Sequence, residues 1–220
     1  MTTFLTPAMA AEPFDMSGRT LTLPAGSAGT AAIADGAVTL TKLPAGVFTA
    51  DATGRGKLAA GFIDHTLLPA GAVVQQVGNQ TGAVATGTGT YSLADSAPTT
   101  SGGTEFLTQA ITPRATSNIL LIDTVLFLSN SLGSGTFIAG LFQDSTSNAL
   151  AAGAQVVANS GVVVGLAFRH RMTAGTTSAT TFRVRAGFSA AATITLNGSL
   201  GSRLFGGVFA SAISITEVKA

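Results

Sequence analysis

Residues 34–75 contain ADGAVTLTKL (34–43), FTADATGRGKLAAGF (48–62) and DHTLLPAGAVVQ (64–75), and strand-forming residues dominate the chain from there on. Each phrase has the composition of a short helix or turn with few apolar side chains. A fragment this small cannot build a hydrophobic core of its own. Linked fragments of this kind become stable when identical chains wrap around each other and supply the missing core. The stretch therefore predicts an intertwined fibre and not a monomeric enzyme.

These phrases resemble the shaft-to-head passages of bacteriophage fibre proteins. ITPRATSNILLI (111–122) and TTSATTFRV (176–184) are similar to phrases common in the heads of such fibres. The resemblance covers roughly residues 34–220 and implies a short threefold shaft followed by a C-terminal β-sandwich head. Such a head is similar to tumour-necrosis-factor-like trimers in architecture and not in sequence. Residues 1–33, where a fibre would carry its anchor, match nothing in this group.

The composition is apolar and poor in charge. Hydrophobic residues make up 46% of the chain, whereas charged residues make up 10%; an ordinary soluble domain has about 25% charged residues. Such a deficit indicates either membrane insertion or burial between subunits. No stretch approaches the ~20 apolar residues of a membrane span, and the apolar run 162–168 ends against Arg169. Burial between subunits is the favoured explanation, and the small residues would let strands of three subunits approach closely.

The sequence lacks the features of several kinds of binding site and of a signal peptide. The chain has no cysteine, which excludes disulfides and thiolate metal sites. The formal net charge is +1 with no basic run, which disfavours nucleic-acid binding. Residues 1–11 have no basic start typical of a signal peptide. We expect synthesis in the host cytoplasm and incorporation into a virion, with no cofactor.

Three segments are expected: an N-terminal arm at 1–33, a short intertwined shaft at 34–71 and a head at 72–220. Prolines in the arm oppose a long helix, and its many apolar residues oppose a freely disordered tail. The arm is predicted to dock on other virion proteins, and packing on its own trimer is the alternative.

The head is predicted to be all-β, an antiparallel jelly-roll-like sandwich of a homotrimer. Residues 133–135 and 144–148 are expected to connect hairpins. The last strand is expected to lie centrally and to close the sandwich, with a bulge near Ala212. The predicted strands are 73–78, 89–94, 105–111, 119–129, 135–143, 154–158, 162–172, 180–188, 193–196 and 205–217.

Arginine forms the sharpest polar pattern. Arg169 and Arg171 lie two apart on one predicted strand, and Arg183 and Arg185 lie two apart on the next. If these strands form a hairpin, all four guanidinium groups share one face. Like charges this close together destabilise a sheet unless partner groups of opposite charge or hydrogen-bond acceptors bind them. We expect the guanidinium groups to bind a neighbouring subunit, through Asp123, Asp144, Glu105 or main-chain carbonyls. The alternative is capture of an anionic glycan or a lipopolysaccharide phosphate.

The catalytic signal is weak. His65 follows Asp64, but neighbours in sequence do not face each other on a helix, so packing or a cap is favoured over a base and its orienting group. Three copies of His65 on a trimer axis could bind an ion. His170 is expected to lie opposite Arg169 and Arg171. The acidic residues show no glycosidase spacing, so no catalytic, metal or cofactor residue is assigned.

The function expected from these features is non-enzymatic attachment of a phage virion to its bacterial host by a trimeric tail fibre. A capsid-decorating or capsid-stabilising trimer is the alternative, and a polysaccharide depolymerase using Asp95, Asp123 or Asp144 is a lesser one. A bacterial surface glycan or protein is the expected receptor, although the chain has no tryptophan and only one tyrosine, Tyr91, for stacking on a sugar ring. Candidate contact loops are 130–135, 144–148, 173–178 and 189–192.

Overall fold

The computed structural model describes residues 48–50, 56–58 and 65–220. By its internal contacts the chain divides into two units, Met1–Ile63 and Asp64–Ala220. The predicted arm and most of the predicted shaft lie outside the described residues.

The described part of the first unit is one short strand pair. β1 (Phe48–Ala50) and β2 (Gly56–Leu58) are antiparallel, with Phe48 opposite Leu58. The second sequence phrase, which was expected to be a short helix or turn, therefore contains strands.

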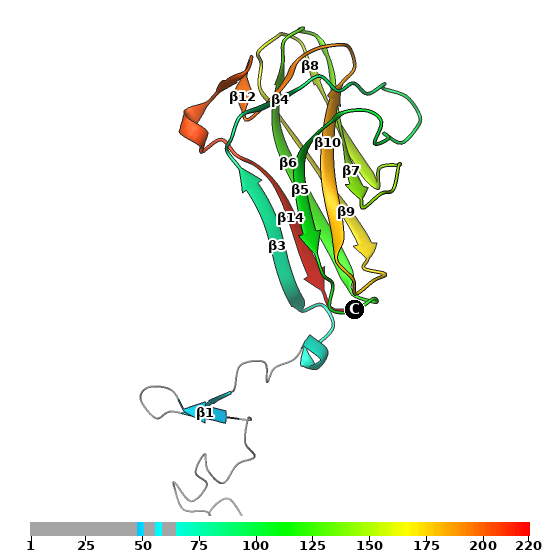
Figure 1. Ribbon diagram of the computed structural model, residues 1–220, viewed down its shortest axis with the longest axis vertical. Helices are drawn as coiled ribbons and strands as arrows, with labels where there is room; N and C mark the ends of the chain where they lie inside the picture. The colour runs from blue at the N-terminus through cyan, green and yellow to red at the C-terminus, as the bar shows by residue number, and fades with distance from the viewer. Residues whose placement is uncertain (1–47, 51–55, 59–64) are drawn as a thin grey trace, which may run out of the picture. The chain divides into compact units, whose positions relative to one another are not determined.

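The second unit is a sandwich of two antiparallel sheets (Figure 1). The four-stranded sheet, here called the β10 sheet, has the order β5 (Thr104–Ile111), β10 (Thr180–Phe188), β7 (Gly135–Gln143) and β8 (Ala151–Val157). In the six-stranded sheet, here called the β6 sheet, β14 (Ser211–Val218) lies between β3 (Val73–Thr81) and β6 (Ile119–Asn130). β9 (Val164–Thr173), β11 (Ile194–Leu196) and β4 (Ala85–Gly87) complete it, with β9 on the other edge of β6.

The strand order confirms the predicted jelly roll. β5, β6 and β7 alternate between the sheets, as do β8, β9, β10 and β14, so most consecutive strands face each other across the core. The last strand is central, as expected. Within the described residues the helices are single 3-10 turns, η4 (His65–Leu67) and η5 (Phe205–Gly207), and none has the length or apolarity of a membrane-spanning helix.

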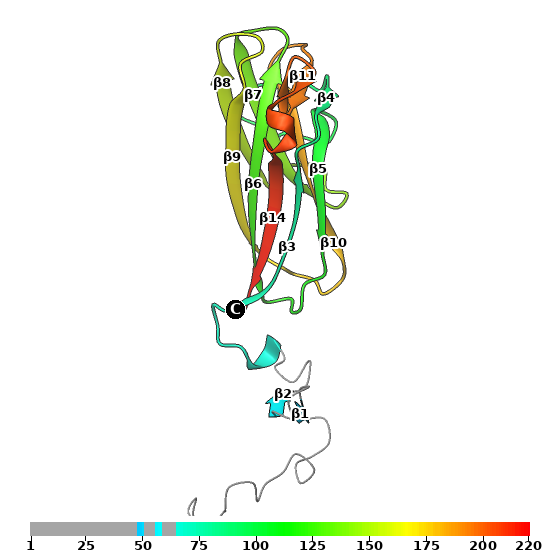
Figure 2. The same ribbon diagram turned by 90° about the vertical axis from the view of Figure 1, so that its left-hand side faces the viewer.

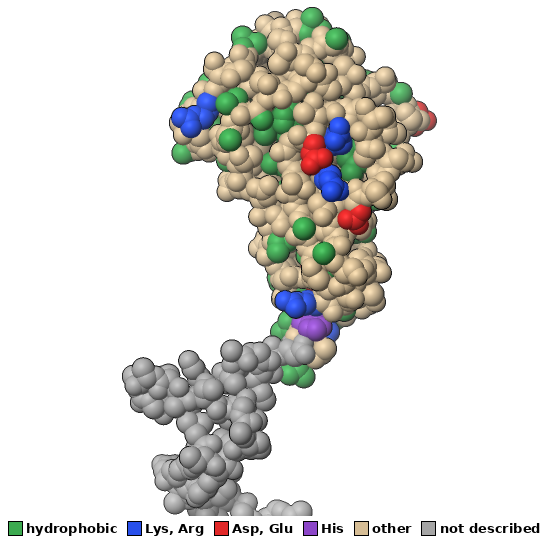
Figure 3. Space-filling view, in the orientation of Figure 1, with side chains coloured by type: hydrophobic (Ala, Val, Ile, Leu, Met, Phe, Trp, Pro, Cys, Tyr) green, Lys and Arg blue, Asp and Glu red, His purple; other side chains and the backbone are tan. Residues whose placement is uncertain are grey.

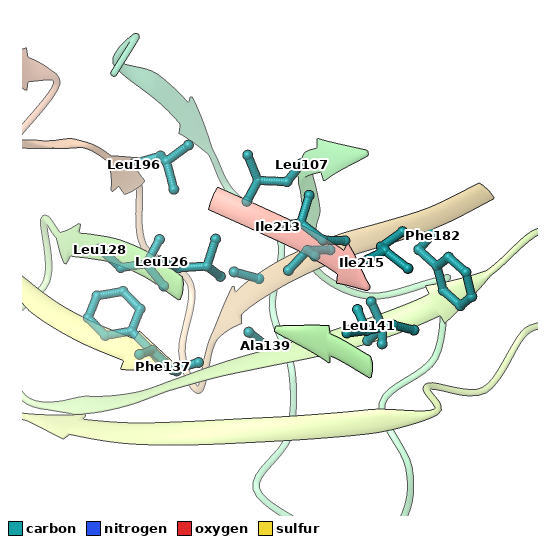
Figure 4. Packing of buried hydrophobic residues seen from close by; sticks show 14 of the residues in the cluster. Leu107, Leu126, Leu128, Phe137, Ala139, Leu141, Phe182, Leu196, Ile213 and Ile215 are labelled. Carbon is teal, nitrogen blue, oxygen red and sulfur yellow. The ribbon is translucent and has the colours of Figure 1, made fainter. Parts of the chain in front are cut away.

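The core lies between the sheets and follows the period-two pattern of the strands. Leu120 and Ile122 of β6 are fully buried, as are Phe182 and Val184 of β10. Figure 4 shows side chains of β6 and β14 meeting those of β7 and β10. Burial of one such side chain is worth about 1.5–3 kcal/mol, so the interlocked layer is the main source of stability.

The predicted strand boundaries are confirmed where alternation is regular. β7 and β10 occupy the predicted 135–143 and 180–188. The predicted strand 89–94 is wrong: Thr90 makes only an isolated bridge with Phe188, and the strand in this region is β4. The predicted strand 205–217 begins too early, because Phe205, Gly206 and Gly207 have positive φ angles of 49°, 65° and 96° that no strand tolerates.

Two connections differ from expectation. The 144–150 segment does join the paired strands β7 and β8. The 131–134 segment joins β6 to β7, which lie in different sheets, and is therefore not a hairpin. The bulge expected near Ala212 is absent from β14, whose register with β3 shifts between Glu217 and Val218 instead.

Glu217 is a buried carboxylate at the end of β14. It occupies an inward position of the strand and is fully buried. Its Oε1 accepts hydrogen bonds from Asn118 Nδ2 at 2.6 Å and from the Arg114 backbone N–H at 2.8 Å, and its Oε2 accepts one from Gln75 Nε2 at 2.6 Å. Burial alone would raise the pKa of Glu217, but these hydrogen bonds together hold it below its ordinary value. The carboxylate thus ties β3, β14 and the β5–β6 connection together.

Candidate functional site

The four arginines do not share one face. β9 pairs with β6, whereas β10 pairs with β5 and β7, so the predicted β9–β10 hairpin is wrong. The connection between them crosses from sheet to sheet, and the Ala174 and Gly175 N–H groups donate to the Asn118 and Thr116 carbonyls at 2.8 and 2.9 Å. The two arginine pairs consequently lie on opposite outer faces of the sandwich.

Arg183 and Arg185 surround Glu105 on the outer face of the β10 sheet. Arg185 Nη1 lies 3.5 Å and Arg183 Nε 3.8 Å from Glu105 Oε2. Arg185 also donates to the Gly102 and Gly103 carbonyls at 3.1 and 2.9 Å. Arg183 Nη1 donates to the Asp144 carbonyl at 2.8 Å. Glu105 and Asp144 were predicted to bind these arginines from a neighbouring subunit; here Glu105 and the Asp144 carbonyl belong to the same chain, and contact with a neighbouring subunit stays a prediction.

Arg169 and Arg171 lie on the outer face of the β6 sheet. Arg169 is opposite Asp123 in the strand register, and its Nε binds Asp123 Oδ1. The pair is open to solvent, with 71% and 46% of the two side chains exposed. No salt bridge is found for Arg171 among the described residues. His170 points inward between them, as predicted, and burial lowers its pKa.

A cover over the β10 sheet was not foreseen. Tyr91 is 7% exposed and packs with Ile138 and Phe142 on the outer side of β7. A Cβ atom at Gly187 would lie 2.7 Å from the tyrosine ring, so glycine is needed for this close contact. The Tyr91 hydroxyl donates to the Thr99 carbonyl at 3.2 Å. Residues 88–103, here called the covering loop, therefore seal much of this face, and Tyr91 is no platform for a sugar ring.

The outer face of the β6 sheet has no such cover from the described residues. Its centre is a shallow depression of about 320 Å³ lined by Asp123, Thr124, Val125, Ala167, Ala212 and Ser214. Above it, the rings of Phe127 and Phe209 stack with centroids 4.1 Å apart, and Phe205 contacts Phe209 edge-on at 5.7 Å. Figure 2 shows η5, which begins with Phe205, in front of the upper part of this sheet.

The far end of the head, where β6 ends and β7 begins, carries a second exposed apolar group. Leu132, Val162 and Leu200 are 55%, 43% and 59% exposed. Residues 130–135, 158–163 and 189–202 at this end contain no Asp, Glu, Lys or Arg, and the nearest charged residue after them is Arg203, which pairs with Gly198. We call Leu132, Val162 and Leu200 the apolar tip.

Buried hydrogen bonds hold the loops of the apolar tip together. Asn130 is fully buried, and its Oδ1 accepts from the Leu132 and Gly133 N–H groups at 2.8 and 2.7 Å. The Gly161 N–H donates to the Asn130 carbonyl at 2.8 Å, and Ser199 Oγ donates to the Gly161 carbonyl at 2.7 Å. The three apolar side chains are thus presented by connected, fixed loops.

The predicted contact loops divide between the two ends of the head. Residues 130–135 and 189–192 lie at the far end, linked by the Ser131 N–H, which donates to the Thr193 carbonyl at 3.0 Å. Residues 144–148 and 173–178 lie at the opposite end, where β10 begins. Only the first two loops belong to the apolar tip region.

The remaining titratable candidates are dispersed. His65 begins η4, and its predicted partner Asp64 lies outside the described residues. Asp144 Oδ2 accepts from Thr180 Oγ1 at 2.7 Å, and its Oδ1 accepts from the Thr181 N–H at 2.8 Å. In the part of the chain that the structure describes, no group of three or more His, Asp or Glu side chains has the arrangement of a metal site.

Comparisons with known proteins give distant likenesses only. No protein-family model matches the chain, and no curated protein matches it. The structure is similar to that of Eiger TNF from S. frugiperda, with 10% identity, coverage of 66% of this chain and 94% of that chain, and a TM-score of 0.37. It is also similar to the C-terminal domain of EclA, a sugar-binding protein, with 14% identity, coverage of 60% of this chain and 80% of that chain, and a TM-score of 0.28. A third similar structure is that of infectious bursal disease virus, Gx strain, with 10% identity, coverage of 68% of this chain and 39% of that chain, and a TM-score of 0.30. Likenesses this distant do not carry an argument for function, which rests on the geometry of the chain itself.

Proposed function

We propose that this protein is a homotrimeric fibre of a phage virion that attaches the particle to its bacterial host without catalysis. The apolar tip carries this proposal, because three exposed aliphatic side chains on fixed loops form a ready contact surface at one end of a rigid sandwich. An uncharged tip suits a neutral receptor surface, either a protein or a glycan. Three heads per fibre would let each contact be weak.

The contacts that the charged residues already make within the chain support attachment over the depolymerase alternative. Asp123 lies on β6 and Asp144 in the connection between β7 and β8, and each is engaged by partners of the same chain. Arg183 and Arg185 are committed to Glu105 and to main-chain carbonyls. Figure 3 shows few charged side chains on the face that it presents. Arginine capture of an anionic glycan is accordingly not part of the proposal.

The test is binding of the purified full-length protein to cells of the bacterial host. We expect Leu132→Asp combined with Leu200→Asp to lower binding at least about tenfold, because each charge would have to be desolvated at the contact. Val156→Asp on β8 is the matched control, since Val156 is 69% exposed but lies outside the tip. Binding to phage capsids in place of host cells would favour the capsid-decorating alternative.

A further inference from the structure

We infer that a second copy of this chain covers the outer face of the β6 sheet. The aromatic rim at η5, formed by Phe127, Phe205 and Phe209, would be the upper edge of the contact. The inference rests on the proposed homotrimer and assigns the face through which its heads associate. The centre of this face is the depression around Val125, Ala167 and Ala212.

The contrast between the two sheets is the first argument. The β10 sheet has its outer face sealed by the covering loop, with Ile138 and Phe142 buried beneath Tyr91. The β6 sheet carries comparable outward residues, Val125 and Phe127. The ring of Phe209 stacks on Phe127, whereas Val125 lines an open depression that no described segment of the chain covers. Ala167, Ala212 and Ser214 have short side chains, so another surface could approach the sheet closely.

The rim is the second argument. Phe205, which begins η5, is 72% exposed and contacts Phe209 of the Phe127–Phe209 stack, and Val208, directly after η5, is 86% exposed. Phe205 is held at φ 49°, a conformation that is strained for a non-glycine residue. A large ring that a strained turn holds in solvent is stabilised when a partner buries its apolar surface.

Charge complementarity selects a second copy as the occupant. On this face Asp123 uses Oδ1 for Arg169, and no hydrogen bond or salt bridge is found for its Oδ2 among the described residues. Arg171 on the same face has no salt bridge in that part of the chain. One copy thus offers an acceptor and an unpaired cation, and Arg171 of one copy can bind Asp123 of the next around a closed ring.

The test exploits the absence of cysteine from the natural sequence. Ala167→Cys places a thiol on the proposed contact face, and Ala154→Cys places one on the outer face of the β10 sheet. Both alanines are exposed, outward-facing strand residues in the single chain. Each purified full-length variant is labelled with a maleimide, natively and in denaturant, and the mass of the native protein in solution is measured in parallel.

We expect a trimer in which Cys at 167 is labelled at least about tenfold more slowly than Cys at 154, with equal rates after denaturation. Because the protein is pure, protection of the thiol comes from this chain, in the same copy or in another. Protection that is lost when the protein is diluted to the monomer assigns the cover to another copy. A trimer that labels equally fast at both positions would overturn the assigned face and leave the proposed fibre intact. A monomer would overturn the homotrimer together with the face.

Discussion

At the scale of single residues, two buried polar side chains hold the ends of the β6 sheet. Glu217 fixes the end where β14 finishes, through donors from β3 and the β5–β6 connection. Asn197 fixes the other end: its Nδ2 donates to the Thr81 and Ala83 carbonyls at 2.7 and 3.0 Å, and its Oδ1 accepts from the Ser211 N–H at 3.0 Å. Buried groups satisfied in this way are costly to remove singly.

Glu217→Gln should lower the free energy of unfolding at pH 7 by about 2 kcal/mol, because an amide nitrogen would face hydrogen-bond donors. The pH dependence follows from the lowered pKa. In the unfolded chain the glutamate titrates near its ordinary value of 4.5, so its stabilisation is fully present above that pH and is lost as the pH falls through the lower folded-state pKa. Denaturant titrations at several pH values measure both effects.

Glu105→Gln is the matched control for this prediction. Glu105 is on the surface, with 37% of its side chain exposed, so its loss should change stability by less than about 1 kcal/mol. An acid-side slope that stays unchanged in Glu217→Gln would contradict the role assigned to Glu217.

Asn197→Ala should destabilise the head by about 3 kcal/mol, since several buried backbone groups lose their partners. Asn197 has φ 55°, which asparagine tolerates better than alanine. Asn197→Gly should therefore be about 1 kcal/mol more stable than Asn197→Ala, although it loses the same hydrogen bonds. Equal stability of the two variants in urea titrations would show that the backbone conformation carries no cost.

At the scale of elements, the covering loop is a long connection that behaves as part of the sandwich. The Ala149 N–H donates to the Pro98 carbonyl and the Thr100 N–H to the Ser147 carbonyl, both at 2.9 Å. The Tyr91 ring lies over Gly187 and against Gly102 and Gly103. One aromatic side chain therefore anchors a segment that has little regular secondary structure of its own.

Tyr91→Ala should release this loop, because the ring that fills the space above the β10 sheet is removed. We expect about 3 kcal/mol of destabilisation and faster proteolysis within residues 92–98. Leu93→Ala is the control: Leu93 is 70% exposed in the same loop and should leave both quantities nearly unchanged. Cleavage at the natural rate in Tyr91→Ala would mean that hydrogen bonds alone hold the loop.

At the scale of the whole molecule, the proposed association of identical chains rests on low charge and on a sheet face that the described residues leave uncovered. In the proposed trimer, folding and association are linked, so we expect stability to depend on protein concentration. The melting temperature of the full-length protein should rise by several degrees over a hundredfold increase in concentration. Val125→Lys, which places a charge in the depression, should weaken this dependence, whereas Ala152→Lys on the opposite sheet should keep it. Calorimetry on dilution series of the three proteins decides the matter.

Much of the fold could be predicted from alternation along the chain. β7 and β10 have the predicted boundaries because every second side chain enters a dry core. The prediction failed where glycine and positive φ angles interrupt alternation, at 89–94 and at η5. It failed for the arginine face because period two tells which side of its own strand a residue takes and not which sheet the strand joins.

The all-β class and the inward residues of most strands can thus be derived from the order of the residues alone. The strand pairing in space was needed to learn that Arg169 and Arg183 lie on opposite faces, that Tyr91 covers one sheet and that the other sheet lacks such a cover within the described residues. The difference is one of range along the chain. Alternation is a local property of a pleated strand, whereas strand pairing and the covering of a face depend on contacts between segments far apart in the chain.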